Sequence, residues 1–274
     1  MFAEYPLVRN ASAFSTRFGV LSRPSRSGSS PSSASSCLMR SCILLFYISI
    51  TGLVLLAQSA DDLYADRANI ASARRAAEIW TADLKSNPSA FDTAWKLARI
   101  AYWLGGHAPE PERRAFLESG IEAARKAAAL QPGRPEGHFW IAANMGALAE
   151  SFGLRAGLKY RKPIKDELET VLNIDPMFMT GSPDRALGRW YFKVPGLFGG
   201  SNKKAEDHLR ASLKYDEQST VTHFFLAEVL LDVGRKSEAR AELQKVLDAP
   251  LSAQWAPEDR DYKERATSLL PKTK

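Results

Sequence analysis

The side chains of this chain that are best suited to recognising another molecule form two short clusters of aromatic and polar residues. The first cluster lies in the segment GHFWIAAN and consists of His138, Phe139, Trp140 and Asn144. The second lies in the stretch GRWYFKVPGLFGGS, residues 188–201, and consists of Arg189, Trp190, Tyr191, Lys193 and Phe198. Aromatic walls that carry an amide or a cation suit the binding of an amphipathic molecule, an organic acid or a partner peptide. Both clusters are therefore candidate ligand- or partner-binding residues.

Both clusters also have a purely structural interpretation. Aromatic residues at helical spacing more often complete a core than bind a ligand, so Tyr191 and Phe192 can pack against their own repeat. His138 and Asn144 can instead form hydrogen bonds with backbone groups of a neighbouring repeat. The sequence leaves the two interpretations open.

Catalytic chemistry has no comparable signal in the sequence. We find no nucleophile elbow, phosphate-binding GxxxxGK[ST] loop, HExxH motif or EF-hand loop. The four histidines, His107, His138, His208 and His223, lack the spacing of metal ligands. Both cysteines precede residue 43, so the rest of the chain can form no disulfide. We expect a non-enzymatic protein without catalytic residues, metal or cofactor.

The net charge of +6 over 274 residues comes mainly from the front of the chain. Residues 1–59 contain five arginines and one acid, which leaves 32 basic and 30 acidic residues in the remainder. A nearly balanced body argues against a nucleic-acid-binding surface.

Residues 1–59 have the layout of an export signal that follows an extension. The segment SGSSPSSASS is of low complexity, so we interpret 1–38 as disordered or as a misassigned extension. Residues 39–59 carry Arg40, 15 uncharged residues and then small residues, which is typical of a cleaved signal peptide. The apolar run is short for a membrane span, and neither cysteine follows it as a lipid-anchor cysteine would. We expect residues 60–274 to form one periplasmic or secreted domain without a stable membrane span.

The main body repeats one pattern of paired helices. Amphipathic helices end at similar polar stops in SNP, QPG and IDP, where Pro88, Pro132 and Pro176 follow one another at intervals of 44 residues. A helix rich in aromatic and small residues follows each stop. The unit ending at Pro250 matches the tetratricopeptide repeat, in which Gly234 ends the first helix. We predict an all-α, right-handed solenoid of four to five tetratricopeptide-like hairpins.

Three stretches are expected to be enlarged connectors within these hairpins: GGHAPEPERR, SFGLRAGLKYRKP and KVPGLFGGSNKK. Insertions of this kind often lie on the binding face of a solenoid. In the third stretch, Gly196, Gly199 and Gly200 are expected to turn the chain at positive φ, and Ser201 to cap the next helix.

Several of these segments, above all the connector motif GRWY–KVPG–GGS, resemble the T-component proteins of TRAP transporters over roughly residues 60–270. The resemblance implies a periplasmic helical accessory protein, as a monomer or a homo-oligomer, with a small hydrophobic ligand. Its partner would be a periplasmic substrate-binding protein that delivers small apolar or organic-acid ligands. The alternative is a generic tetratricopeptide scaffold that binds a peptide or an envelope protein in its concave groove.

Overall fold

The computed structural model describes residues 58–274, so the predicted extension and nearly all of the predicted signal peptide lie outside the described residues. Every regular element in this part is a helix. The α-helices are α1 (Ala60–Ala65), α2 (Ile70–Ser86), α3 (Phe91–His107), α4 (Glu110–Leu130), α5 (Pro135–Ser151), α6 (Gly153–Ile174), α7 (Phe178–Lys193), α8 (Asn202–Ser212), α9 (Thr220–Asp232), α10 (Lys236–Asp248) and α11 (Ala256–Leu269). Two short 3₁₀ turns, η1 (Gly196–Phe198) and η2 (Leu270–Thr273), complete the described elements. The predicted all-α repeat fold is confirmed, and none of these helices of residues 58–274 meets the length and hydropathy that a membrane span requires.

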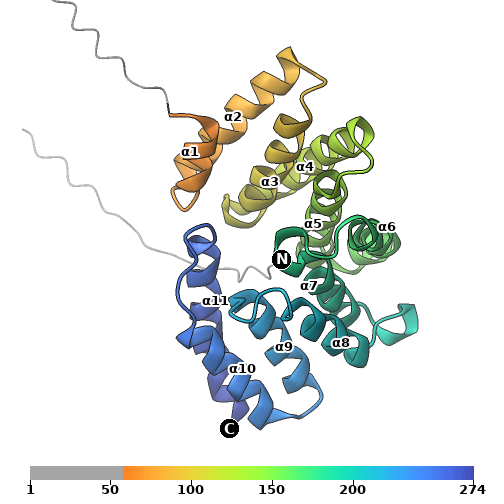
Figure 1. Cartoon of the computed structure of the whole chain (residues 1–274), viewed down its shortest axis with the longest axis vertical. Helices are drawn as coiled ribbons and strands as arrows, with labels where there is room; N and C mark the ends of the chain where they lie inside the picture. The colour runs from red at the N-terminus through yellow and green to blue at the C-terminus, as the bar shows by residue number, and fades with distance from the viewer. Residues whose placement is uncertain (1–57) are drawn as a thin grey trace, which may run out of the picture. The chain divides into compact units, whose positions relative to one another are not determined.

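Buried helices alternate with half-exposed helices along the chain. α5, α7 and α9 are buried on almost every side, whereas α4, α6, α8 and α10 are amphipathic and expose one polar face. The antiparallel pairs α3–α4, α5–α6, α7–α8 and α9–α10 therefore bury one helix of each hairpin beneath its partner and the next hairpin. Figure 1 shows α5 and α7 in the middle of the array and α6 at its periphery.

Helix ends follow the local signals in the sequence. Ser201 accepts a hydrogen bond from the backbone N–H of Lys204 at the start of α8, as predicted. Gly234 adopts φ of 77° just after α9 and ends it, also as predicted. These caps set the lengths of the helices and hence the positions at which the chain reverses.

Two of the three predicted connectors are wrong. α3 continues to His107 and α4 begins at Glu110, while Phe152 alone separates α5 from α6. The stretches expected to be loops are rich in Leu, Arg, Lys and Glu, which favour helix. Pro163 lies inside α6, where the burial of Ile164 and Leu168 outweighs a cost of about 3 kcal/mol for an internal proline. Of the third predicted connector, KVPGLFGGSNKK, residues 194–201 do connect two helices, whereas its first residue ends α7 and its last three begin α8.

The start of α7 contains a left-handed turn. Met179, Thr180 and Gly181 have φ of 45°, 55° and 77°, and the right-handed helix resumes with Ser182 and Pro183. A Cβ atom on Gly181 would lie 2.7 Å from the Tyr215 ring, so a glycine is required there for space as well as for φ. Because two non-glycine residues hold strained backbone angles, the packing around this turn must compensate for the strain.

Candidate functional site

The connector between α7 and α8 folds back onto the end of α7. The backbone N–H of Ser201 donates to the carbonyl oxygen of Tyr191 at 2.8 Å, which closes the loop. Of the three glycines, only Gly199 has positive φ, at 103°. Gly200 is needed for another reason, because a Cβ there would lie 1.6 Å from the carbonyl oxygen of Val194. The expectation of positive φ at Gly196 and Gly200 is therefore wrong.

A pocket of about 280 Å³ lies beneath this connector. Its walls come from the end of α5, the first half of α6, the end of α7 and the connector itself. Four of the predicted binding residues line it: Arg189, Trp190, Lys193 and Phe198. The structure therefore brings most of the second sequence cluster to one concave site, which α6 completes with Leu158 and Ile164.

The aromatic residues of this pocket differ in exposure. Trp190 is 7% exposed, and its Nε1–H donates to the carbonyl oxygen of Arg161 at 2.8 Å. Phe198 is 38% exposed, and the guanidinium of Arg161 lies 5.2 Å from its ring centroid. Tyr191 is absent from the lining; it stacks on His208, with ring centroids 5.3 Å apart. The pocket thus has a fixed indole wall and a more accessible phenyl ring at the connector.

Arg189 forms a buried ion-pair network behind the pocket. Its Nε lies 3.1 Å from Glu150 of α5, and its Nη1 lies 2.7 Å from Glu228 of α9. The guanidinium also lies 4.6 Å from the Phe225 ring centroid. Because removal of one partner would leave buried charge uncompensated, this network fixes α7 between α5 and α9.

The first sequence cluster is separate from the pocket. Phe139 and Trp140 are fully buried in the core, and the Nδ2 of Asn144 donates to the carbonyl oxygens of Ala98 and Trp140 at 3.1 and 2.8 Å. His138 lies 2.6 Å from Glu167 through Nδ1. Asn144 therefore makes the hydrogen bond between repeats that the sequence offered as its structural interpretation. A binding role for the four residues of this cluster stays a prediction.

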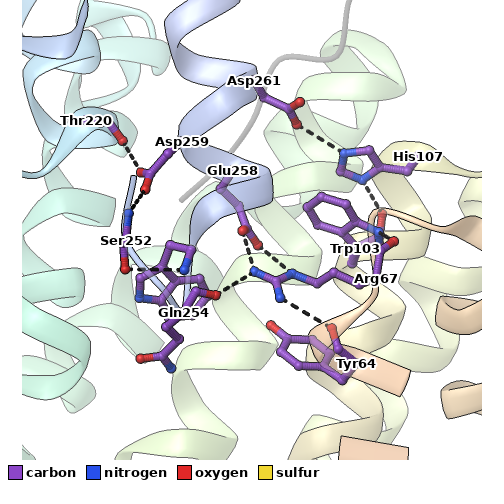
Figure 2. Close-up of polar contacts among 11 residues, drawn as sticks. Tyr64, Arg67, Trp103, His107, Thr220, Ser252, Gln254, Glu258, Asp259 and Asp261 are labelled. Carbon is purple, nitrogen blue, oxygen red and sulfur yellow. Dashed lines mark hydrogen bonds and ion pairs between the residues drawn. The ribbon is translucent and has the colours of Figure 1, made fainter. Parts of the chain in front are cut away.

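A second polar region joins the two ends of the described chain, and no sequence signal pointed to it. Arg67, in the turn between α1 and α2, pairs with Glu258 of α11 and donates to the carbonyl oxygen of Gln254 at 2.9 Å. Figure 2 shows this guanidinium held between the two carboxylate oxygens and the ring of Tyr64. No sequence motif could identify this pair, because its members lie 191 positions apart.

Neighbouring contacts extend this region along α11. The Nε1–H of Trp103 donates to the carbonyl oxygen of Arg67 at 2.8 Å, and His107 lies 3.2 Å from Asp261 (Figure 2). Asp259 accepts hydrogen bonds from the Thr220 hydroxyl and from the backbone N–H of Ser252, at 2.6 and 2.8 Å. The region thus combines ion pairs with a hydrogen-bonded carboxylate.

The histidines of the described residues serve as links between elements. His138, His208 and His223 each face one carboxylate of another helix, at 2.6, 2.7 and 2.5 Å respectively. Residues 58–274 contain no group of three or more His, Cys, Asp or Glu side chains placed to hold a metal ion. The chemistry that the described site offers is recognition through aromatic surface, cations and hydrogen-bond donors.

Comparisons with known proteins give one family match and several similar structures. The family model "Regulator of microtubule dynamics protein 1-3" matches residues 56–198, a little over half of the chain. Among solved structures, TTC0263, a thermophilic TPR protein of Thermus thermophilus, is 23% identical with a TM-score of 0.58, covering 77% of this chain and 95% of that one. MamA is 14% identical with a TM-score of 0.45, covering 73% of this chain and 95% of its own. No curated protein sequence matches the chain.

These findings overturn the resemblance to TRAP T-components and the transport-accessory function that it implied. The matched family segment includes the connector through Phe198, the part on which that resemblance relied most. The connector's residues meet local needs of this chain, such as the close approach at Gly200 and the cap at Ser201, so they do not identify a transport family. The tetratricopeptide-like fold itself is confirmed by TTC0263.

Proposed function

Because this chain belongs to the regulator of microtubule dynamics protein 1-3 family, we propose that it is a non-catalytic scaffold that binds microtubules and thereby changes their growth or shortening. This function replaces the periplasmic transport role and keeps the alternative interpretation of the sequence, a tetratricopeptide-like scaffold that binds a protein segment. The partner in this proposal is tubulin in its assembled form.

One observation carries the proposal most directly. Every residue that lines the pocket beneath the connector falls within the segment that matches the family, residues 56–198. The pocket holds about 280 Å³, which is near the lower end of ligand-binding pockets and suits one or two side chains of a partner. Helical-repeat proteins commonly bind other proteins through surfaces that several repeats form together.

The side chains of the pocket suit a protein partner. Phe198 offers a partly exposed ring, Trp190 supplies a rigid wall, and Lys193 and Arg161 add cations to the lining. Aromatic and arginine anchors near a pocket often contribute most of the binding free energy of an interface. We therefore assign Arg189, Trp190, Lys193 and Phe198 to partner binding, with Arg189 acting mainly through the position of α7.

The proposal is tested with the purified full chain and microtubules grown from pure tubulin. We expect the protein to sediment with microtubules and to change growth rate, shortening rate or catastrophe frequency, as measured by fluorescence microscopy of single microtubules. Tubulin incubated with bovine serum albumin at the same concentration is the control. Unchanged dynamics together with no co-sedimentation would overturn the proposal.

A further inference from the structure

Arg185 of α7 is a buried cation that lacks a carboxylate partner in residues 58–274. It is 4% exposed, its Nη2–H donates to the hydroxyl of Ser182, and its Nε–H has no hydrogen-bond partner. By contrast, Arg189, one turn further along α7, pairs with two glutamates. Burial lowers the pKa of Arg185 to about 10, which still leaves the group charged at neutral pH. Burying a charge without a counter-charge costs free energy of folding. The unpaired arginine therefore indicates that a bound molecule supplies the counter-charge.

Arg185 is among the residues that line a second pocket, of about 220 Å³. This pocket lies between the start of α7, the turn before α9, the segment before α11 and α11 itself. Tyr262 of α11 also lines it, and the Tyr262 hydroxyl is buried without a hydrogen-bond partner. Burial raises the pKa of Tyr262 to about 12, so the hydroxyl keeps its proton and can donate it. Arg185 and Tyr262, which both line the pocket, therefore each have a donor without a hydrogen-bond partner in residues 58–274.

The three acids of this pocket already have partners. Glu258 pairs with Arg67, and Asp259 accepts from Thr220 and Ser252, as Figure 2 shows. Asp216 accepts from the backbone N–H of Gln218 at 3.1 Å. Asp216 interacts with Arg185 at longer range, but none of the three lies within ion-pair distance, so Arg185 has no direct carboxylate partner in residues 58–274.

We propose that this pocket binds a single carboxylate of an acidic peptide segment, which accepts hydrogen bonds from the Arg185 guanidinium and the Tyr262 hydroxyl. Charge-assisted bonds from arginine to a carboxylate are among the strongest that proteins form. The three acids in the walls repel any anion, and they repel a doubly charged phosphate more strongly than a carboxylate with a single charge, so the carboxylate is the favoured ligand of Arg185. The volume suits one acidic side chain or chain terminus. This inference rests on the proposed function, because it gives the chemistry of a protein partner.

The test measures binding of a fluorescein-labelled hexaglutamate peptide to the full chain by fluorescence anisotropy, with a hexaglutamine peptide as the neutral control. We expect hexaglutamate to bind more tightly than hexaglutamine. Arg185→Met should weaken hexaglutamate binding by about tenfold or more, and Tyr262→Phe by several-fold. Arg260→Met is the matched control, because Arg260 is an exposed cation on α11 whose loss changes the net charge equally.

Folding and binding are separated in the same experiment. Removing a buried, unpaired charge should leave the urea midpoint of Arg185→Met equal to or above that of the unsubstituted chain, so lost binding would not reflect unfolding. The assignment would be overturned if Arg185→Met bound hexaglutamate as tightly as the unsubstituted chain does. It would also be overturned if the unsubstituted chain bound hexaglutamate and hexaglutamine with equal affinity. Sodium acetate should compete with the peptide more effectively than inorganic phosphate at the same ionic strength; the reverse order would also overturn it.

The outcome is independent of the microtubule assay. If hexaglutamate binding fails while microtubule dynamics still change, the carboxylate site is wrong and the proposed function stands. If hexaglutamate binds through Arg185 but microtubules are unaffected, the site is correct and the partner is an acidic protein other than tubulin.

Discussion

Arg67 and Glu258 form an ion pair across 191 positions of sequence, with the Nε of Arg67 3.0 Å from a carboxylate oxygen. The Arg67 side chain is 2% exposed and lies over the rings of Tyr64 and Trp103. Most contacts in a helical repeat array join neighbouring repeats. This pair is unusual because it joins the turn between α1 and α2 to α11, the last α-helix. The ion pair holds α11 against the first helices of the array.

Glu258→Gln should lower the free energy of unfolding by about 1–3 kcal/mol, because Arg67 would keep a neutral acceptor but lose its counter-charge. Urea denaturation followed by circular dichroism measures the change. Glu264→Gln, at an exposed position of the same helix, is the matched control. An unchanged midpoint for Glu258→Gln would show that the pair contributes no stability.

Lowering the pH should remove the contribution that the Glu242 carboxylate makes to the free energy of unfolding. Burial raises the pKa of this carboxyl, but hydrogen bonds from His223 and Lys245 outweigh burial and hold its pKa below the ordinary value of 4.5. The ionised group therefore stabilises the fold fully above pH 4.5, and this contribution is lost as the pH falls through the lower, folded-state pKa. We expect the stability advantage of the unsubstituted chain over Glu242→Gln to shrink between neutral pH and about pH 3. A constant difference across that range would contradict the assignment.

Gly200→Ala should destabilise the protein by about 1–3 kcal/mol, since the new Cβ would overlap the carbonyl oxygen of Val194 and force the connector apart. Gly196→Ala should change stability by less than about 0.5 kcal/mol, because nothing lies within 4 Å of its added Cβ. Thermal unfolding of both variants provides the comparison. Equal melting temperatures would mean that the connector relaxes without cost.

Phe198→Ala should weaken microtubule binding several-fold, because it removes the accessible ring from the connector pocket. Leu197→Ala is the matched control: Leu197 is the adjacent residue, is 89% exposed and does not line the pocket. Both variants should unfold close to the unsubstituted chain, and co-sedimentation with microtubules measures their affinity. Equal weakening by both substitutions would place the contact elsewhere on the connector.

Much of the fold was accessible from local sequence signals. The polar stop SNP predicted the end of an amphipathic helix, which the structure shows as α2, ending at Ser86 with Trp80 and Leu84 buried. Ser201 and Gly234 marked a helix start and a helix end correctly. These signals succeed because helical periodicity and capping depend on residues within a few positions of one another.

The candidate site was only partly accessible in this way. The connector cluster was found from its composition, and Arg189, Trp190, Lys193 and Phe198 do line one pocket. Composition could not show that Tyr191 turns away toward His208, and it could not decide between binding and a bond between repeats for Asn144. It also could not distinguish one family of helical repeats from another, because aromatic and small residues in buried helices serve the same packing in all of them.

The sequence by itself therefore determined the helices, their order and the hairpin repeat, since periodicity, proline stops and caps act over short distances. Only the tertiary structure decided which polar groups meet: Arg67 with Glu258, Arg189 with Glu150 and Glu228, and Arg185 with no carboxylate in residues 58–274. The physical reason is that the environment of a charge depends on side chains brought in from distant helices. Three arginines that look alike in sequence thus have different roles: Arg67 joins α11 to the first helices, Arg189 belongs to a buried ion-pair network, and Arg185 is a candidate binding group.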